Sequence, residues 1–446
     1  MRVPIATQQL PASYIEAAPA PLDESTLTLI WAHVLIPGRG PPVQDGAVAI
    51  RDSKIEWVGE FQHRPHRYQN VRPTRVHALM PGLWDCHTHF LAIDVAYTLG
   101  RYSGEFLPGF PALAGAVTVD DLRATLNAGY TSVRELGGFG GDLWPAVKNG
   151  PLVGPNIYSS IGLLSITGGH RDEQAVPSAT ITEAMMYGSM PMAVCDGVPD
   201  CIKTVRKMVR RGARVIKVCS SGGVLSLNDD PEDRQFSDEE LRAIVDEAGR
   251  SRRAVAAHAI GKAGILAGLR AGVKTIEHGM YLDDEVADLM IEKDAIYVPA
   301  QHIVRVLMTD YLDTLPEPAR QKVMKLYHQS QTAYKLAIKK GVKIAMGTDS
   351  GSSDRRSGLS HGKNAHELVY AVELGMTPLQ AIESATAIAP ETLGALAPLS
   401  GQLKMGFDAD IIAIRKNPLE DIKVLAEADN ITHVWKGGKL YKRLYE

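Results

Sequence analysis

Short alternating runs of apolar and polar residues mark both ends of the chain. From Thr26 to Val76 they predict β-strands, with a polar turn at residues 51–54. Similar runs lie between Gly401 and Leu440. Because either set alone has too few strands for a stable fold, we expect both termini to build one small β-sandwich domain, residues 26–79 plus 397–446. Residues 1–25 are rich in proline and alanine without a period, which predicts a poorly ordered arm.

Between these ends, over residues 80–396, strand-like and helix-like segments alternate. The first predicted strand starts at Val76 and leads into His87-Thr88-His89. Seven more are predicted at residues 131–136, 156–161, 214–219, 254–258, 274–277, 296–300 and 343–346. Eight strands alternating with helices predict an α/β fold, a (β/α)8 TIM barrel with its function at the carboxyl ends of the strands. A doubly wound open sheet is the alternative, but no Gly-x-Gly-x-x-Gly pattern follows an early strand.

Composition narrows the class of protein. The 446 residues suffice for a barrel and a smaller domain, and 45% hydrophobic with 22% charged residues is an ordinary globular composition. A net charge of -3 gives no reason to expect nucleic acid or an acidic membrane surface as partner. Four cysteines in so long a chain predict reduced thiols rather than a disulfide framework. With no signal-peptide pattern and no apolar run of membrane-spanning length, we expect a soluble cytoplasmic protein.

Residues that bind metals stand at the predicted strand ends. His87 and His89 are two positions apart on a strand, so both imidazoles point the same way and could reach one metal ion. Lys217 lies inside an apolar run, where an unpaired ammonium is costly, and carbamylation by CO2 would make it an anionic ligand able to bridge two metals. Three later strands end in His258, His278 and Asp349. Each residue alone could be structural, but together they suit two Zn2+ or similar divalent ions.

This set of strand-end residues resembles the amidohydrolase superfamily of metal-dependent hydrolases. It is most similar to the Xaa-Pro dipeptidase-like and ochratoxinase-like branch, over residues 26–441. The matching stretches are residues 80–89, 215–224, 257–258, 277–281 and 347–349. The resemblance implies that His87, His89 and Asp349 hold one metal, that His258 and His278 hold the second, and that carbamylated Lys217 bridges them. It also implies that Asp349 exchanges protons with the attacking water and the leaving amine.

The resemblance further suggests substrate contacts. His170 matches a pocket histidine and could donate to the scissile carbonyl or to a substrate carboxylate, although a solvent-facing loop histidine is the alternative. Tyr281 could contact the substrate or pack as an aromatic side chain. Gly222 and Gly223 could let a loop approach the substrate closely or could form a turn. The polar segment 352–357 could be a lid.

We therefore expect a zinc-dependent binuclear amidohydrolase acting on a small-molecule amide. The leaving group would be an amino acid, released from a dipeptide such as Xaa-Pro or from an N-acyl amino acid such as ochratoxin A. A cyclic-amide hydrolase of the imidazolonepropionase kind would use the same metal core and remains open. A non-catalytic scaffold would normally lack some ligands, and none is missing here. Because relatives are commonly oligomeric, the resemblance favours a homo-oligomer.

Overall fold

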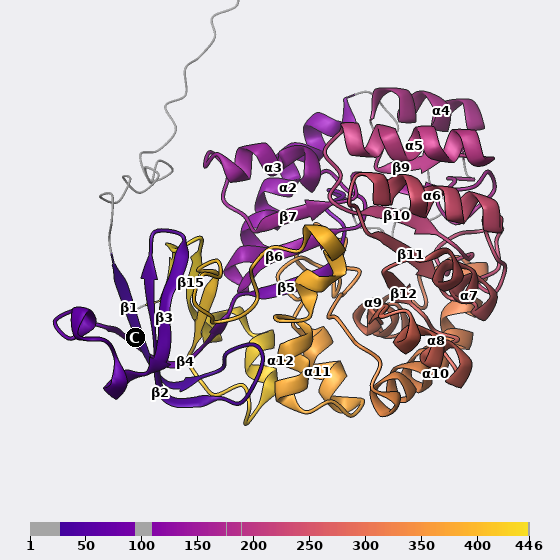
Figure 1. Cartoon of the computed structure of the whole chain (residues 1–446). Coiled ribbons are helices and arrows are strands. Elements are labelled where there is room, and N and C mark those ends of the chain that lie inside the picture. Colours follow the sequence, from indigo (N-terminus) through magenta and orange to yellow (C-terminus); the bar gives the residue numbers. More distant parts are fainter. Residues whose placement is uncertain (1–26, 94–108, 175, 189, 445–446) are drawn as a thin grey trace, which may run out of the picture.

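Strands from both ends of the chain lie in one sheet (Figure 1). The computed structural model describes residues 27–93, 109–174, 176–188 and 190–444, so the predicted arm at residues 1–25 lies outside the described part. The sheet has seven strands in the order β16-β15-β14-β4-β1-β2-β3. Their bounds are β1 (Thr28–Leu35), β2 (Val43–Arg51), β3 (Lys54–Glu60), β4 (Thr74–Pro81), β14 (Ile411–Ile414), β15 (Ile431–Lys436) and β16 (Lys439–Arg443). The two termini thus build one sheet, while its division into a two-layer sandwich and the domain boundaries stay predictions.

Successive side chains along the strands of this sheet point to opposite faces, and both faces carry apolar residues. On one face Ile30 and Val48 pack in a buried cluster that includes Ile411. On the other face Leu29 packs in a cluster that includes Tyr68. Because successive side chains of a strand point to opposite faces, one apolar run can fill both clusters.

Two parallel sheets carry the middle of the chain. The first consists of β5 (Leu83–Thr88), β6 (Tyr130–Glu135) and β7 (Asn156–Ser159). The second has the order β13-β12-β11-β10-β8-β9. Its strands are β8 (Leu163–Ser165), β9 (Met192–Val194), β10 (Ile216–Cys219), β11 (Val255–Ala259), β12 (Thr275–His278) and β13 (Ile296–Val298). Parallel strands separated by helices confirm the predicted α/β class.

Backbone hydrogen bonds connect the two parallel sheets at both ends. Between β7 and β10, the Arg214 N–H donates to the Ser159 carbonyl at 2.8 Å. On the other side, the segment 343–346 lies between β13 and β5. It accepts hydrogen bonds from the backbone N–H groups of Tyr297 and Cys86, at 2.8 and 2.9 Å. The hydrogen-bonded series therefore returns from β13 to β5, which brings the carboxyl ends of distant strands together.

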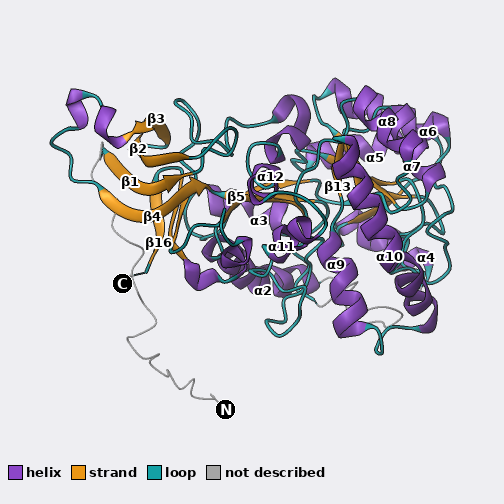
Figure 2. Ribbon diagram, turned by 90° about the horizontal axis from the view of Figure 1, so that it is seen from below, coloured by secondary structure: helices purple, strands orange, loops and turns teal. Residues whose placement is uncertain are grey.

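Helices connect most of the parallel strands and pack on their outer side (Figures 1 and 2). They are α2 (Phe110–Asn127), α3 (Gly140–Lys148), α4 (Ser178–Tyr187), α5 (Val198–Arg210), α6 (Asp238–Arg250), α7 (Lys262–Ala271), α8 (Asp284–Glu292), α9 (Gln301–Val306), α10 (Glu317–Lys340), α11 (His366–Glu373) and α12 (Pro378–Ser384). Capping boxes at Ser237 and Thr377 start α6 and α12, because the side chain of each cap satisfies a free N–H group of the first turn. None of the helices in the described ranges has the length and apolar character needed to cross a membrane.

The first predicted strand is two strands in the structure. β4 pairs in the terminal sheet and ends at Pro81, and β5 starts at Leu83 beside β6. Gly82 separates them at a close approach, because a Cβ atom there would lie 2.1 Å from the Thr131 hydroxyl. The prediction of one continuous strand from Val76 was wrong because the apolar run continues across this change of sheet.

The eighth predicted strand also differs. Residues 343–346 make only an isolated bridge, between Ile344 and Tyr297, and are not a regular strand. The short strands β8 and β9 were not predicted.

Candidate active site

A pocket of about 750 Å³, including its open mouth, lies at the carboxyl ends of the parallel strands. Residues from β5, β10, β11 and β12 and from the segment after residue 346 contribute to its wall. All six predicted metal ligands line it, together with one predicted substrate contact: His87, His89, Lys217, His258, His278, Asp349 and His170. The pocket thus collects side chains from strands that are far apart in the sequence.

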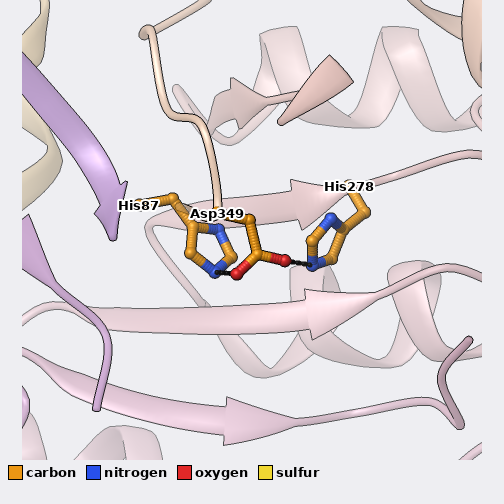
Figure 3. Close-up of side chains that lie close together, drawn as sticks. All are labelled: His87, His278 and Asp349. Carbon is orange, nitrogen blue, oxygen red and sulfur yellow. Dashed lines mark ion pairs between the residues drawn. The ribbon is translucent and has the colours of Figure 1, made fainter. Parts of the chain in front are cut away.

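Asp349 occupies the centre of a group of histidines (Figure 3). Its Oδ1 atom lies 3.0 Å from His89 Nε2 and 3.5 Å from His87 Nε2, and its Oδ2 atom lies 3.8 Å from His278 Nε2. Ligand atoms of His87, His278 and Asp349 lie within 4.8 Å of one another, so these three residues can hold a metal ion. Burial alone would raise the pKa of Asp349, but the neighbouring imidazoles, with His87 the strongest, hold it well below its usual value.

Both histidines of the His-x-His pair are oriented through their second ring nitrogen. His87 Nδ1 lies 3.0 Å from Glu277 Oε2, an ion-pair contact without the alignment of a hydrogen bond, and His89 Nδ1 lies 2.7 Å from the Gly137 carbonyl oxygen. In each ring this leaves Nε2 directed at Asp349. Such outer contacts fix the ring orientation of metal-binding histidines and strengthen them as ligands.

Glu277 belongs to a buried charged network that sequence reasoning missed. Its Oε1 accepts a hydrogen bond from Arg134 Nη2 at 2.7 Å and another from the Thr275 hydroxyl, and both charged side chains are fully buried. Arg134 also donates from Nε to the Cys86 carbonyl at 2.6 Å and from Nη1 to Thr275 at 2.9 Å. The network therefore ties β5, β6 and β12 together directly behind His87. Glu277 stood next to the predicted ligand His278, but nothing in the sequence paired it with Arg134.

Two of the central residues have a left-handed backbone. The φ angles are 69° at His278 and 59° at Asp349, a conformation that costs residues with a Cβ atom free energy and is common at functional sites. Hydrogen bonds hold both in place. The Tyr297 hydroxyl donates to the His278 carbonyl at 2.9 Å, and the Asp349 N–H donates to the His87 carbonyl at 2.7 Å. These bonds keep both side chains directed at the shared centre.

Lys217 is the most unusual member of the group. Only 1% of its surface is exposed, and its Nζ atom has no hydrogen-bond partner among the described residues. Burial lowers the pKa of Lys217, and burial also holds the pKa of His258 well below its usual value. An unpartnered amine beside imidazoles and a carboxylate fits a carbamylated lysine that holds divalent cations. Carbamylation would remove the cost of the unpartnered amine, and the cations would bind the free ligand atoms.

His170 lies in the pocket wall beside His258. The two rings stack with their centroids 4.3 Å apart, and the His170 side chain is 10% exposed, so it does not face solvent. Ser226 Oγ lies 2.8 Å from His170 Nδ1, which leaves Nε2 for a ligand. A Cβ atom on Gly223 would lie 2.1 Å from the His170 ring, so only glycine leaves room for this ring position. A role of His170 in catalysis stays a prediction.

Gly222 and Tyr281 do not line the pocket. The Gly222 carbonyl oxygen lies 3.2 Å from His258 Nε2, which leaves Nδ1 of that ring for a metal. The Tyr281 hydroxyl donates to Glu232 Oε1 at 3.0 Å. A substrate contact by Gly222, Gly223 or Tyr281 therefore stays a prediction.

The remainder of the wall was not predicted from the sequence. Arg171 contributes a cationic side chain directly after His170. The other contributors are apolar, and several come from α9 and from the loop after Gly223: Leu91, Leu163, Val224, Leu225, Ile260, Met280, Ile303, Val304 and Leu307. In the sequence, the apolar segments that contain these residues look the same as segments that fill a hydrophobic core, so only the fold shows which residues line the pocket.

The segment 351–366 is anchored near the pocket. Arg355 Nη2 pairs with Asp121 Oδ1 on α2 at 2.9 Å, and the His361 ring stacks on Phe90 with the centroids 4.5 Å apart. The segment contributes Gly351 to the pocket wall. The role of residues 352–357 as a lid stays a prediction.

The fold and this pocket define the class of protein. Residues 78–441 match the Amidohydrolase family, so the chain belongs to that family, and the predicted resemblance is confirmed. The chain is 44% identical to the ochratoxinase of Aspergillus niger over 434 residues, which covers 95% of this chain and 88% of that protein. The crystal structure of A. niger ochratoxinase superposes with a TM-score of 0.87 and covers 94% of this chain and 96% of that chain.

Two further relatives are less similar. A prolidase crystallised with N-methylphosphonate-L-proline is 30% identical, with a TM-score of 0.81, and covers 94% of this chain and all of that chain. An imidazolonepropionase from Cupriavidus metallidurans is 32% identical over 109 residues, 22% of this chain and 25% of that protein. Family and relatives together support an enzyme of the amide-bond hydrolase class.

Proposed function

We propose that the chain is a zinc-dependent binuclear amidohydrolase built on a (β/α)8 barrel, with a small β-sandwich domain formed by both termini. His87, His89 and Asp349 would hold one cation, and His258 and His278 the other. Lys217, carbamylated on Nζ, would bridge the two.

One observation carries this proposal. The buried, unpartnered amine of Lys217 lines the same pocket as four imidazoles and the Asp349 carboxylate. A non-catalytic scaffold gives no reason to keep this costly amine together with a complete ligand set. Bound divalent cations would lower the pKa of water and polarise a carbonyl group.

The chain's own residues would move the protons and position the substrate. The Asp349 carboxylate would accept the proton of the attacking water and return it to the leaving nitrogen. His170, held through Nδ1 by Ser226, would present Nε2 to the substrate. A substrate bound against the apolar part of the wall would displace water, which would strengthen the electrostatic interactions inside the pocket.

The pocket lining favours a substrate with an apolar part. Half of the residues that line the pocket are aliphatic, as is usual for small-molecule sites with a few polar groups. Ochratoxin A and related N-acyl phenylalanines combine an aromatic acyl group with an apolar amino-acid leaving group. The similarity to ochratoxinase and to a prolidase favours N-acyl amino acids and Xaa-Pro dipeptides over cyclic amides, because the imidazolonepropionase match covers only 22% of this chain.

Release of free amino acid tests the proposal. The zinc-loaded chain would be incubated with N-acyl phenylalanines including ochratoxin A, with Xaa-Pro dipeptides and with cyclic amides, and products would be quantified by chromatography. We expect release from an N-acyl amino acid or a dipeptide. Asp349→Asn should abolish it, whereas Asp288→Asn, a matched change in an exposed carboxylate that pairs with Lys340, should not.

Other outcomes would contradict the proposal. Turnover of cyclic amides alone would favour the imidazolonepropionase-like alternative. Little bound zinc and no turnover would favour a scaffold. The proposal further includes a homo-oligomer, which light scattering would test, and a cytoplasmic location, for which the four buried free cysteines are the support.

A further inference from the structure

Arg171 is a cation in the pocket wall that pairs with no carboxylate of the described residues. Arg171 lines the pocket, and its side chain makes no ion pair or hydrogen bond with any described residue. Its Nε atom is buried without a partner. A buried donor of a charged group costs free energy unless a ligand satisfies it.

Two acidic side chains of this region, Asp172 and Asp229, are engaged with other groups. Asp172 accepts a hydrogen bond from the Gly168 N–H at 2.8 Å. Asp229 accepts from the Gly223 N–H at 2.9 Å and lies 3.3 Å from Lys322 Nζ. Since most of the remaining wall is aliphatic, the guanidinium of Arg171 is placed to receive an anionic group from a ligand rather than from the protein.

The position of Arg171 relative to the histidines limits which anionic group it can receive. Arg171 directly follows His170, whose ring stacks on His258. An anion bound here therefore lies close to the reacting atoms. In an N-acyl amino acid the α-carboxylate is only three bonds from the scissile carbonyl carbon. A guanidinium matches a carboxylate in geometry, because two parallel N–H groups can bind both oxygens.

We propose that Arg171 binds the α-carboxylate of the amino-acid leaving group and so selects substrates with a free carboxylate next to the scissile amide. This inference rests on the proposed function, since it assigns a residue to the substrate class proposed for the same pocket. N-acyl amino acids whose α-carboxyl group is converted to an amide or an ester should therefore be poor substrates.

A paired substrate experiment tests this assignment. The best N-acyl amino acid from the panel and its carboxamide counterpart would be compared with the wild type, Arg171→Gln and Arg171→Lys. We expect the wild type to prefer the acid by about 10- to 100-fold in kcat/KM, the range for a charge-assisted hydrogen bond. Arg171→Gln should lose this preference through a higher KM for the acid, with little change for the carboxamide. Arg171→Lys should be intermediate.

Two controls separate this role from a structural one. Arg250→Gln removes a 75% exposed arginine side chain on α6 and should leave the preference unchanged. Zinc content and melting temperature should match the wild type in all variants. Calorimetric titration with L-phenylalanine and L-phenylalaninamide measures carboxylate binding without turnover, and the wild type alone should favour the acid.

The outcomes distinguish the two proposals. If the wild type binds L-phenylalanine more tightly than L-phenylalaninamide but hydrolyses no substrate of the panel, the proposed function is contradicted and the Arg171 assignment stands. An active wild type whose preference for the acid is unchanged in Arg171→Gln would overturn the Arg171 assignment alone.

Discussion

Replacing Glu277 by glutamine tests the buried network behind His87. The substitution keeps the shape of the side chain but removes the charge that pairs with Arg134 at 2.7 Å, where both side chains are fully buried. Removing one partner of such a pair usually costs about 3–5 kcal/mol, because the other charge stays buried and uncompensated. We expect a loss of about 3 kcal/mol, the lower end of this range, since glutamine retains an oxygen that accepts from Arg134.

The same substitution should weaken metal binding. Glu277 Oε2 lies 3.0 Å from His87 Nδ1, and loss of such an outer contact typically reduces metal affinity by about 10- to 100-fold. Denaturant unfolding of the metal-free proteins measures the first effect, and zinc competition with a chromophoric chelator measures the second. Glu247→Gln is the matched control. Its partner Arg206 is 64% exposed, so little stability should be lost, with no effect on zinc. A Glu277→Gln variant with the same stability and zinc affinity as the wild type would refute the role assigned to this carboxylate.

Three further substitutions have distinct expected results. Lys217→Ala should remove bound metal and activity together, measured by elemental analysis and turnover, and retention of both would exclude Lys217 as a ligand. Gly223→Ala places a Cβ atom 2.1 Å from the His170 ring, so displacing that ring should reduce kcat by about 100-fold with zinc content unchanged. Unaltered turnover would show that the ring position is unimportant. Burial raises the pKa of Glu367 to about 8, so between about pH 4 and pH 8 the folded chain retains a proton that the unfolded chain loses. The free energy of unfolding of the wild type should therefore fall as the pH rises through this range. Glu367→Gln should flatten that dependence in unfolding experiments, and identical pH profiles would contradict the buried, protonated state.

Much of the site could be predicted because strand periodicity and position within the fold are both visible in the sequence. The spacing of His87 and His89 predicted two side chains on the same face, and the structure directs both Nε2 atoms at Asp349. Lys217 stood out because a lysine inside an apolar run is costly, and the structure places it in the pocket without a partner.

Other features depend on contacts between distant segments, which no local pattern encodes. Arg134 and Glu277 are far apart in the sequence and meet only because the fold brings β6 of one parallel sheet close to β12 of the other. The left-handed backbone at His278 is enforced by tertiary hydrogen bonds, against the local preference of a residue with a Cβ atom. Residues 343–346 have the composition of a strand, but a single isolated bridge at Ile344 replaces the regular ladder.

Zinc titration of the chelator-treated chain tests the central claim most directly. Bound zinc would be measured at each step by competition with a chromophoric chelator, alongside release of free amino acid from the best substrate of the panel. The account predicts two zinc equivalents bound per chain and hydrolysis that returns only as both bind. Full hydrolysis by the zinc-free chain, or complete recovery with a single equivalent, would contradict a binuclear amidohydrolase.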